Sequence, residues 1–184
     1  MAEYVELHAH SNFSFQEGAS SVEELVARAV ELGYPALALT DHDNLCGAMR
    51  FARKAKRAGL RPITGAEVTV AAARNDDEPA RTKHRRSEAA SGKASGSRAR
   101  HELAEGASPW HLTLLATSPT GYANLCNLLS FSHYFSDRRS PELDPRLLPE
   151  HAQGLVLLTA CARGEVPSLL TQGHTNEAKE RLKQ

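Results

Sequence analysis

Short apolar runs alternate with amphipathic stretches along this chain. The runs are too short for helices, and we predict that they are strands buried in a sheet. Between them, apolar residues recur at the three- and four-residue spacing of helices that face a core. The predicted strands are residues 4–7, 36–39, 61–70, 110–116 and 155–159. The predicted helices are residues 21–33, 45–58, 120–134, 164–172 and 175–183, with a short helical turn at 145–150.

The order of these elements indicates the fold class. Strand and helix alternate through residues 4–70, which predicts right-handed βαβ units and a parallel sheet. Local signals agree with this assignment. Ser21 and Glu24 have the spacing of a capping box, and Gly33 and Gly59 follow the first two helical patterns. The sequence therefore predicts an α/β fold.

Residues 71–107 interrupt the pattern. They are rich in Ala, Ser, Gly, Arg, Lys and Glu, and Leu103 is their only large aliphatic residue. Such a segment buries too little apolar surface to offset the entropy lost on ordering, so we predict a flexible insertion. Its basic cluster at residues 81–86 can contact a phosphate backbone, or it can belong to a solvated loop.

Length and charge limit the number of domains and the ways in which the chain can bind nucleic acid. The 184 residues suffice for one domain with a sizeable core. Because 22 Lys and Arg residues balance 22 Asp and Glu residues, nucleic-acid contacts have to come from a local patch or from a part of the protein outside this sequence. The predicted helix at 45–58 has a basic face, which is most simply a solvated surface.

Cysteine usage and the chain start indicate a compartment. The three cysteines have no Cys-x-x-Cys spacing, which argues against a disulfide framework or a zinc ribbon and fits a reducing cytoplasm. No apolar run is long enough to span a membrane, and Glu3 and Glu6 stand where a signal peptide is first basic and then apolar. We therefore expect a cytoplasmic protein with no membrane partner.

Histidines follow the first predicted strand. His8 and His10 are two residues apart, so in an extended chain their side chains point to the same face. In β/α folds the carboxyl ends of the strands carry the functional residues. The pair is therefore a candidate metal site, and the alternative is two surface histidines that lie together by chance.

Each of the four remaining predicted strands also contains, or is closely followed by, a residue of a type that binds metals. Glu67 lies among apolar neighbours, where a carboxylate has to be paired, bind a metal or lie on an exposed edge. A shared site explains the full set better than a series of polar core residues, and its chemistry suits two or three ions such as Zn, Mn or Fe. Such clusters hydrolyse phosphoesters with a metal-activated water. The set is His8, His10, His42, Glu67, His111 and Cys161.

The motifs around these residues resemble the PHP family, the polymerase and histidinol phosphatase domains. They are His8-Ala9-His10, Thr40-Asp41-His42, Gly65-Ala66-Glu67 and the downstream His111 and Cys161. Residues 14–20, 38–48 and 111–125 are similar to one branch of the family, the N-terminus of bacterial DNA polymerase III alpha subunits, and most similar to error-prone alpha-type polymerases. The resemblance covers the chain outside residues 71–107.

The resemblance implies a distorted TIM-like β/α barrel of seven parallel strands, about five of them in this chain, with up to three divalent metals at its C-terminal face. Glu17 stands where the family usually has an aspartate or a similar ligand, and its side chain is one methylene longer than that of aspartate. Asp41 either orients His42 or is a carboxylate of the turn. The residues in ligand positions are His8, His10, Glu17, His42, Glu67, His111 and Cys161.

One family motif is missing. The family completes its cluster with an Asp-x-His pair on a late strand, whereas here His174 has no aspartate two residues before it. We therefore expect an N-terminal fragment, or a truncated reading frame, of a much longer polymerase. Residues 1–70 would form the first half of a PHP barrel, residues 71–107 the insertion, and residues 108–184 further barrel elements that stop before the last strands.

Several functions remain open. The first is the PHP domain of an alpha-type DNA polymerase, which acts as a 3′–5′ exonuclease or braces the polymerase, with DNA and the rest of that chain as partners. The second is a free-standing PHP phosphoesterase, and the third is a non-catalytic scaffold stabilised by metal. An amidohydrolase also opens with His-x-His, but it needs a bridging lysine and a late aspartate that this chain lacks. The chain has no polymerase palm motif, so nucleotide addition would belong to the parent DNA-directed DNA polymerase, and whether this chain alone is an enzyme stays open.

Overall fold

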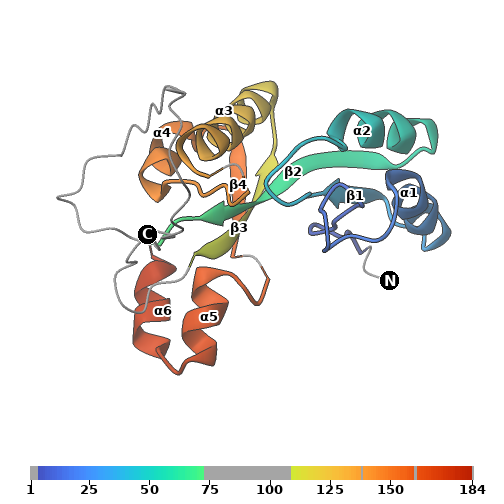
Figure 1. Cartoon of the computed structure of the whole chain (residues 1–184). Coiled ribbons are helices and arrows are strands. Elements are labelled where there is room, and N and C mark those ends of the chain that lie inside the picture. Colours follow the sequence, from blue (N-terminus) through green and yellow to red (C-terminus); the bar gives the residue numbers. More distant parts are fainter. Residues whose placement is uncertain (1–3, 73–108, 138, 160, 184) are drawn as a thin grey trace, which may run out of the picture.

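The computed structural model describes residues 4–72, 109–137, 139–159 and 161–183. Apart from Ala71 and Ala72, the predicted insertion lies outside the described residues. The described part contains one four-stranded sheet in the order β1-β2-β3-β4 with helices packed around it (Figure 1). The strands are β1 (Ala36–Leu39), β2 (Arg61–Val70), β3 (Trp110–Ala116) and β4 (Leu155–Leu158).

The direction of the strands differs from the prediction. Strands β1 and β2 are parallel, as expected for a βαβ unit, but β2 and β3 pair antiparallel, and so do β3 and β4. The prediction of about five parallel strands was therefore wrong in the strand count and in two of the pairings. An apolar run reports that a strand is buried and carries no information about its direction. The mixed α/β class is confirmed.

The predicted first strand is reduced to a single bridge. Glu6 pairs with Leu37 in the parallel direction, and the carbonyl oxygen of Glu6 accepts a hydrogen bond from the N–H of Ala38 at 2.9 Å. The carbonyl oxygen of Ala9 accepts a second one, from the N–H of Thr40, also at 2.9 Å. The segment therefore still runs alongside β1 and brings the histidines that follow it to the end of that strand.

The helices lie close to their predicted positions. Ser21 caps the first of them, because its hydroxyl accepts a hydrogen bond from the N–H of Glu24 while the Glu24 carboxylate accepts one from the N–H of Ser21, as the capping box predicts. None of the described helices is long and apolar enough to cross a membrane. The helices are α1 (Val22–Glu31), α2 (Ala48–Arg57), α3 (Pro119–Phe135), the 3-10 turn η1 (Pro145–Leu147), α4 (Leu148–His151), α5 (Glu165–Thr171) and α6 (Thr175–Arg181).

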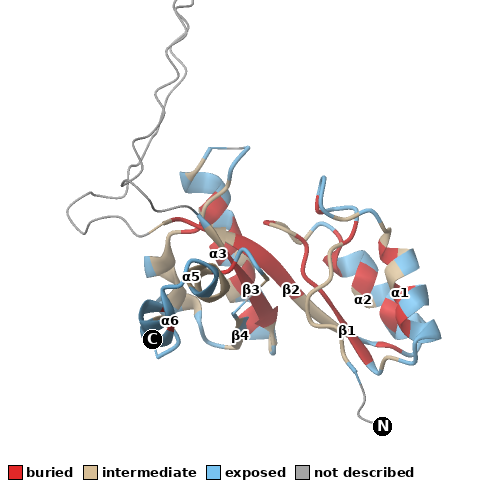
Figure 2. Ribbon diagram, turned by 90° about the horizontal axis from the view of Figure 1, so that it is seen from below, coloured by how far each residue is buried: buried red, intermediate tan, exposed pale blue. Residues whose placement is uncertain are grey.

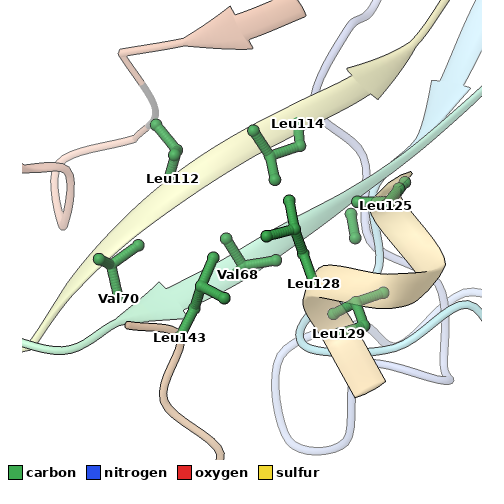
Figure 3. Packing of buried hydrophobic residues seen from close by; sticks show 9 residues of the cluster. Val68, Val70, Leu112, Leu114, Leu125, Leu128, Leu129 and Leu143 are labelled. Carbon is green, nitrogen blue, oxygen red and sulfur yellow. The ribbon is translucent and has the colours of Figure 1, made fainter. Parts of the chain in front are cut away.

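Two apolar cores hold the sheet. In the first, side chains from one face of β2 and β3 pack against α3, as Figure 3 shows for Val68, Leu114 and Leu128. In the second, α1 and α2 pack beside β1 (Figure 2). Phe51 of α2 is fully buried there. Because side chains alternate along a strand, the residues of β2 between Val68 and its apolar neighbours point to the opposite face. Glu67 and the other polar residues of the candidate site lie on that face.

Two glycines allow a close backbone approach at the end of β3 that is remote from His111. A Cβ atom on Gly121, in the first turn of α3, would lie 1.8 Å from the carbonyl oxygen of Gly154. Gly154 has a φ of +75° and precedes β4. Its carbonyl oxygen also accepts a hydrogen bond from the N–H of Thr117 at 2.9 Å. The backbone of helix α3 is thus in direct contact with the backbone of the turn before β4.

Candidate metal centre

Glu67 is the centre of the candidate site. Its side chain is 2% exposed, and its Oε1 atom lies 2.6 Å from Nδ1 of His111. Its Oε2 atom lies 2.5 Å from Nε2 of His8 and accepts a hydrogen bond from Sγ of Cys161 at 3.6 Å. Burial alone would raise the pKa of the Glu67 carboxyl, but the contacts with His111 and His8 outweigh burial and hold the pKa well below its usual range. Glu67 is therefore a buried anion among potential metal ligands.

The antiparallel pairing of β2 and β3 explains why His111 reaches Glu67. His111 pairs with Thr69, and Thr113 pairs with Glu67. His111 and Glu67 are therefore diagonal neighbours on one face of the sheet, within reach of long side chains. Because β3 runs against β2, the start of β3 lies beside the C-terminal half of β2, and His111 enters the site from the beginning of a strand.

His8 and His10 direct unpaired nitrogens towards Glu67. The Nε2 atoms of both histidines are buried and have no hydrogen-bond partner within the described residues. They lie 2.5 Å and 3.9 Å from Oε2 of Glu67, and the shorter contact is not aligned as a hydrogen bond. Burial lowers the pKa of His10, which favours the neutral imidazole that a metal requires, whereas the contact with Glu67 raises the pKa of His8.

Glu17 lies at the rim of the site. Its Oε2 atom is 2.9 Å from Nδ1 of His42 and 3.6 Å from Nδ1 of His10. Its Oε1 atom accepts a hydrogen bond from Nη1 of Arg163 at 2.5 Å. Burial would raise the pKa of Glu17, but the hydrogen bond from Arg163 and the nearby His42 bring it below its usual value. Glu17 therefore stays ionised with one oxygen turned towards the histidines.

Asp43 and Thr69, for which the sequence indicates no role, hold the other side of His42. Nε2 of His42 lies 2.9 Å from Oγ1 of Thr69 and 3.2 Å from Oδ2 of Asp43. Asp43 in turn accepts hydrogen bonds from the N–H and the hydroxyl of Thr69, each at 2.8 Å. The contact with Asp43 raises the pKa of His42 against the effect of burial. Asp43 has a φ of +53°, and no sequence pattern signals this contact.

Asp41 binds the loop that carries Glu17. It is buried and accepts hydrogen bonds from the N–H of Ser11 at 2.7 Å and from the hydroxyl of Ser14 at 2.7 Å. Ser14 also accepts a hydrogen bond from the N–H of His42 at 3.0 Å. In the described structure Asp41 thus acts on the backbone of His42 through Ser14, while the ring of His42 contacts Glu17 and Asp43. The predicted role of Asp41 in orienting His42 stays a prediction.

Two groups of three side chains in the described part of the chain are placed to hold a metal ion. One is His8, His10 and Glu67, and the other is His42, Glu67 and His111. Within each group the three candidate ligand atoms lie within 4.8 Å of one another, and Glu67 belongs to both. Imidazole and carboxylate ligands suit divalent transition metals. The unpaired nitrogens of His8 and His10 fit such an ion, because each offers a lone pair that no described donor occupies.

The two remaining predicted ligands lie next to these groups. Cys161 reaches Glu67 from the segment after β4, and Glu17 reaches His42 from the loop before α1. The structure therefore brings all seven predicted positions together. Whether each of them coordinates a metal stays a prediction.

This combination of an α/β sheet with histidines gathered round a buried carboxylate agrees with the comparison to known families. Residues 6–184 match the model of the PHP domain family. The chain therefore belongs to the PHP domain family.

Individual relatives define the branch. The chain is 38% identical over 192 residues to an error-prone DNA polymerase of Symbiobacterium thermophilum and 38% identical over 177 residues to the DNA polymerase III subunit alpha of Treponema pallidum. Each match covers 96% of this chain but only 14% and 13%, respectively, of the relative. The chain is thus homologous to the N-terminal PHP region of these polymerases and spans a small part of their length.

Solved structures also match part of this chain. An amidohydrolase of Chromobacterium violaceum with bound sulfate and no metal is 26% identical, with a TM-score of 0.43, and the match covers 70% of this chain and 33% of the amidohydrolase. Membership of the PHP family rests on the family model and the sequence relatives.

Proposed function

We propose that this chain is the PHP domain of an alpha-type, error-prone bacterial DNA polymerase and that it binds a divalent-metal cluster for 3′–5′ exonuclease or related phosphoesterase chemistry. One observation carries the proposal. The buried carboxylate of Glu67 is shared by two groups of imidazoles, and two of those imidazoles have no other partner for Nε2. A carboxylate between two such groups is suited to bridge two cations.

Each residue of the site would have a separate role in this chemistry. Bound divalent ions would polarise phosphoryl oxygens and lower the pKa of the attacking water. His8 and His10 would supply neutral nitrogens, and Glu67 would supply the negative charge that balances the cations. Asp43 would fix the orientation of His42, as carboxylates next to ligand histidines commonly do. Exposed Arg163 would hold the Glu17 carboxylate at the rim of the site.

The remaining predictions belong to this proposal. Residues 1–70 and 108–184 would form parts of a TIM-like PHP barrel, with residues 71–107 inserted between them. Zn, Mn or Fe would occupy the cluster. The partners would be DNA and the rest of a polymerase chain that acts in replication or repair in the cytoplasm. A domain that braces the polymerase, a metal-stabilised scaffold and a free-standing phosphoesterase are the alternatives.

Metal content and hydrolysis test the proposal together. The purified chain would be loaded with Zn or Mn, dialysed, and analysed for bound metal. It would then be incubated with a 3′-labelled single-stranded oligonucleotide and, separately, with a small phosphate monoester. We expect about two equivalents of metal or more, and metal-dependent release of the 3′ nucleotide.

A double variant, His8→Ala with His10→Ala, serves as the matched negative control. It should lose metal and hydrolysis together while keeping the circular dichroism spectrum of the unchanged protein. Hydrolysis of the monoester alone would favour the free-standing phosphoesterase. Bound metal without any hydrolysis would favour the scaffold, and a folded protein that binds no metal would reject the metal site.

A further inference from the structure

Helix α2 carries a concentrated positive charge. Its ten residues include five Lys or Arg residues and no acidic residue, in a chain whose formal net charge is zero. Arg50, Arg53, Lys54 and Arg57 have the i, i+3, i+4, i+7 spacing that places side chains on one face of a helix. The helix therefore presents a cationic face, defined here by these four residues.

Most of this charge is not neutralised within the described structure. Arg50 donates a hydrogen bond from Nε to the Glu23 carboxylate of α1 at 2.6 Å. The other three residues of the cationic face form no ion pair with the described residues and are exposed. Lys54 and Arg57 lie in the last turn of α2, where the helix dipole favours cations, so the helix tolerates the charge without acidic partners.

The cationic face lines a shallow hollow beside α1. The hollow has a volume of about 300 Å³ and is bordered by Glu23 and Met49 in addition to the four cations. Its walls therefore offer several cationic side chains to one anionic ligand. A chain of phosphates fits this arrangement better than a single small anion, because the four charges extend over two turns of the helix.

We propose that the cationic face of α2 binds the sugar-phosphate backbone of DNA. Insertion into a membrane is not suited to this helix, because Ala48, Phe51 and Ala55 are buried against the sheet and Met49 is the one large apolar side chain that the described helix exposes. Arginine-rich surfaces of this kind bind nucleic acids mainly through phosphates, with little dependence on base sequence. The proposal goes beyond the hydrolytic function, since it requires no metal and no reaction.

The start of helix α2 lies close to the loop of the candidate metal centre. Helix α2 begins six residues after His42, and a Cβ atom on Gly47, the residue before the helix, would lie 3.0 Å from Oδ2 of Asp41. The loop of the metal centre and the first turn of α2 are therefore in contact.

Binding of a fluorescein-labelled single-stranded oligonucleotide, followed by fluorescence anisotropy, tests the proposal on the full chain. The test variant is Arg53→Gln, Lys54→Gln, Arg57→Gln. Between about 50 and about 200 mM salt, loss of three phosphate contacts should reduce the magnitude of the slope of log K against log salt by about 2 and weaken binding at about 50 mM salt on the order of a hundredfold. Glutamine is a good helix former, so the variant should keep its circular dichroism spectrum.

A charge-matched control completes the design. Arg28→Gln, Lys179→Gln, Lys183→Gln removes the same charge from exposed positions of α1, α6 and the residues after α6, and should bind like the unchanged protein. All titrations contain a chelator, so metal-dependent contacts with DNA do not contribute and a failure of the metal centre is separable from a failure of this proposal. The basic cluster at residues 81–86 is the same in every variant.

Four results would overturn the proposal. They are an absence of binding at low salt, equal binding by the α2 variant, an equal loss in the charge-matched control, and displacement of the oligonucleotide by poly-glutamate more effectively than by unlabelled DNA. The last result would identify the partner as an acidic polypeptide. A loss confined to the α2 variant supports the proposal.

Discussion

Nδ1 of His111 lies 2.6 Å from Oε1 of Glu67, although the two residues are 44 positions apart and the segment between them includes the predicted insertion. The other oxygen of Glu67 faces His8 and Cys161. The two oxygens of one carboxylate therefore serve two different groups of ligands. A substitution of a histidine that belongs to one group should consequently remove the metal of that group alone. A substitution of Glu67, which belongs to both groups, should affect the metal content of both.

Glu67→Gln should remove bound metal from both groups, because glutamine keeps the size of the side chain and loses its negative charge. His10→Ala should empty only the group of His8 and Glu67, and His111→Ala only the group of His42 and Glu67. Metal equivalents per chain, measured by elemental analysis after dialysis, distinguish these cases. If Glu67→Gln kept the full metal content in a folded protein, a bridging role for Glu67 would be wrong.

Asp41→Ala should destabilise the protein by about 1–3 kcal/mol, because the donors of Ser11 and Ser14 would be left without their buried acceptor. Urea denaturation in the presence of a chelator measures this change without a contribution from metal binding. The matched control is Asp137→Ala in an exposed turn, expected within about 1 kcal/mol of the unchanged protein. Equal effects of the two substitutions would contradict the anchoring role of Asp41.

Leu128→Ala should cost roughly 2–5 kcal/mol, since Leu128 is fully buried between α3 and the sheet and its loss leaves a cavity. The same substitution at Leu182, which is 59% exposed, should change the free energy of unfolding by less than about 0.5 kcal/mol. Both values follow from denaturant titrations with unchanged m. A small effect at Leu128 would mean that α3 does not pack on the sheet as described.

Ser21→Ala should destabilise by about 1 kcal/mol, because the N-cap hydroxyl of α1 would no longer accept the hydrogen bond of Glu24. Ser20→Ala is the neighbouring control, and we expect a change within about 0.5 kcal/mol because no described hydrogen bond uses the Ser20 hydroxyl. Thermal unfolding of the two variants side by side gives the comparison. Indistinguishable transitions would show that the capping box contributes nothing measurable.

The sequence was a good guide to where elements lie and a poor guide to strand direction. The apolar runs at residues 61–70 and 110–116 coincide with β2 and β3. Their antiparallel pairing was not predictable, because an apolar run has the same appearance in both directions and the connection at residues 71–107 has no pattern of its own. Tyr4 to Leu7 satisfied the strand pattern, yet only Glu6 pairs with β1 in the described structure.

The candidate site was predictable where side chains that can bind metals lie in or next to a predicted strand. His111 was expected near Glu67 from its strand, and it is there, although for a different reason: it begins an antiparallel strand. The contacts of Asp43 with His42 and Thr69 were not predictable, because they depend on a left-handed backbone conformation at Asp43 and on a register that no local pattern fixes.

The close approach of Gly121 and Gly154 limits the amino-acid substitutions that the protein tolerates at these two positions. A side chain at position 121 would collide with a carbonyl oxygen, and position 154 combines a positive φ with the same crowding. In a library of all single substitutions, both positions should reject every other amino acid. The two glycines lie at the opposite end of β3 from His111. Positions that tolerate no substitution should therefore form two clusters, one at the candidate metal centre and one at these glycines, and the second arises from backbone packing alone.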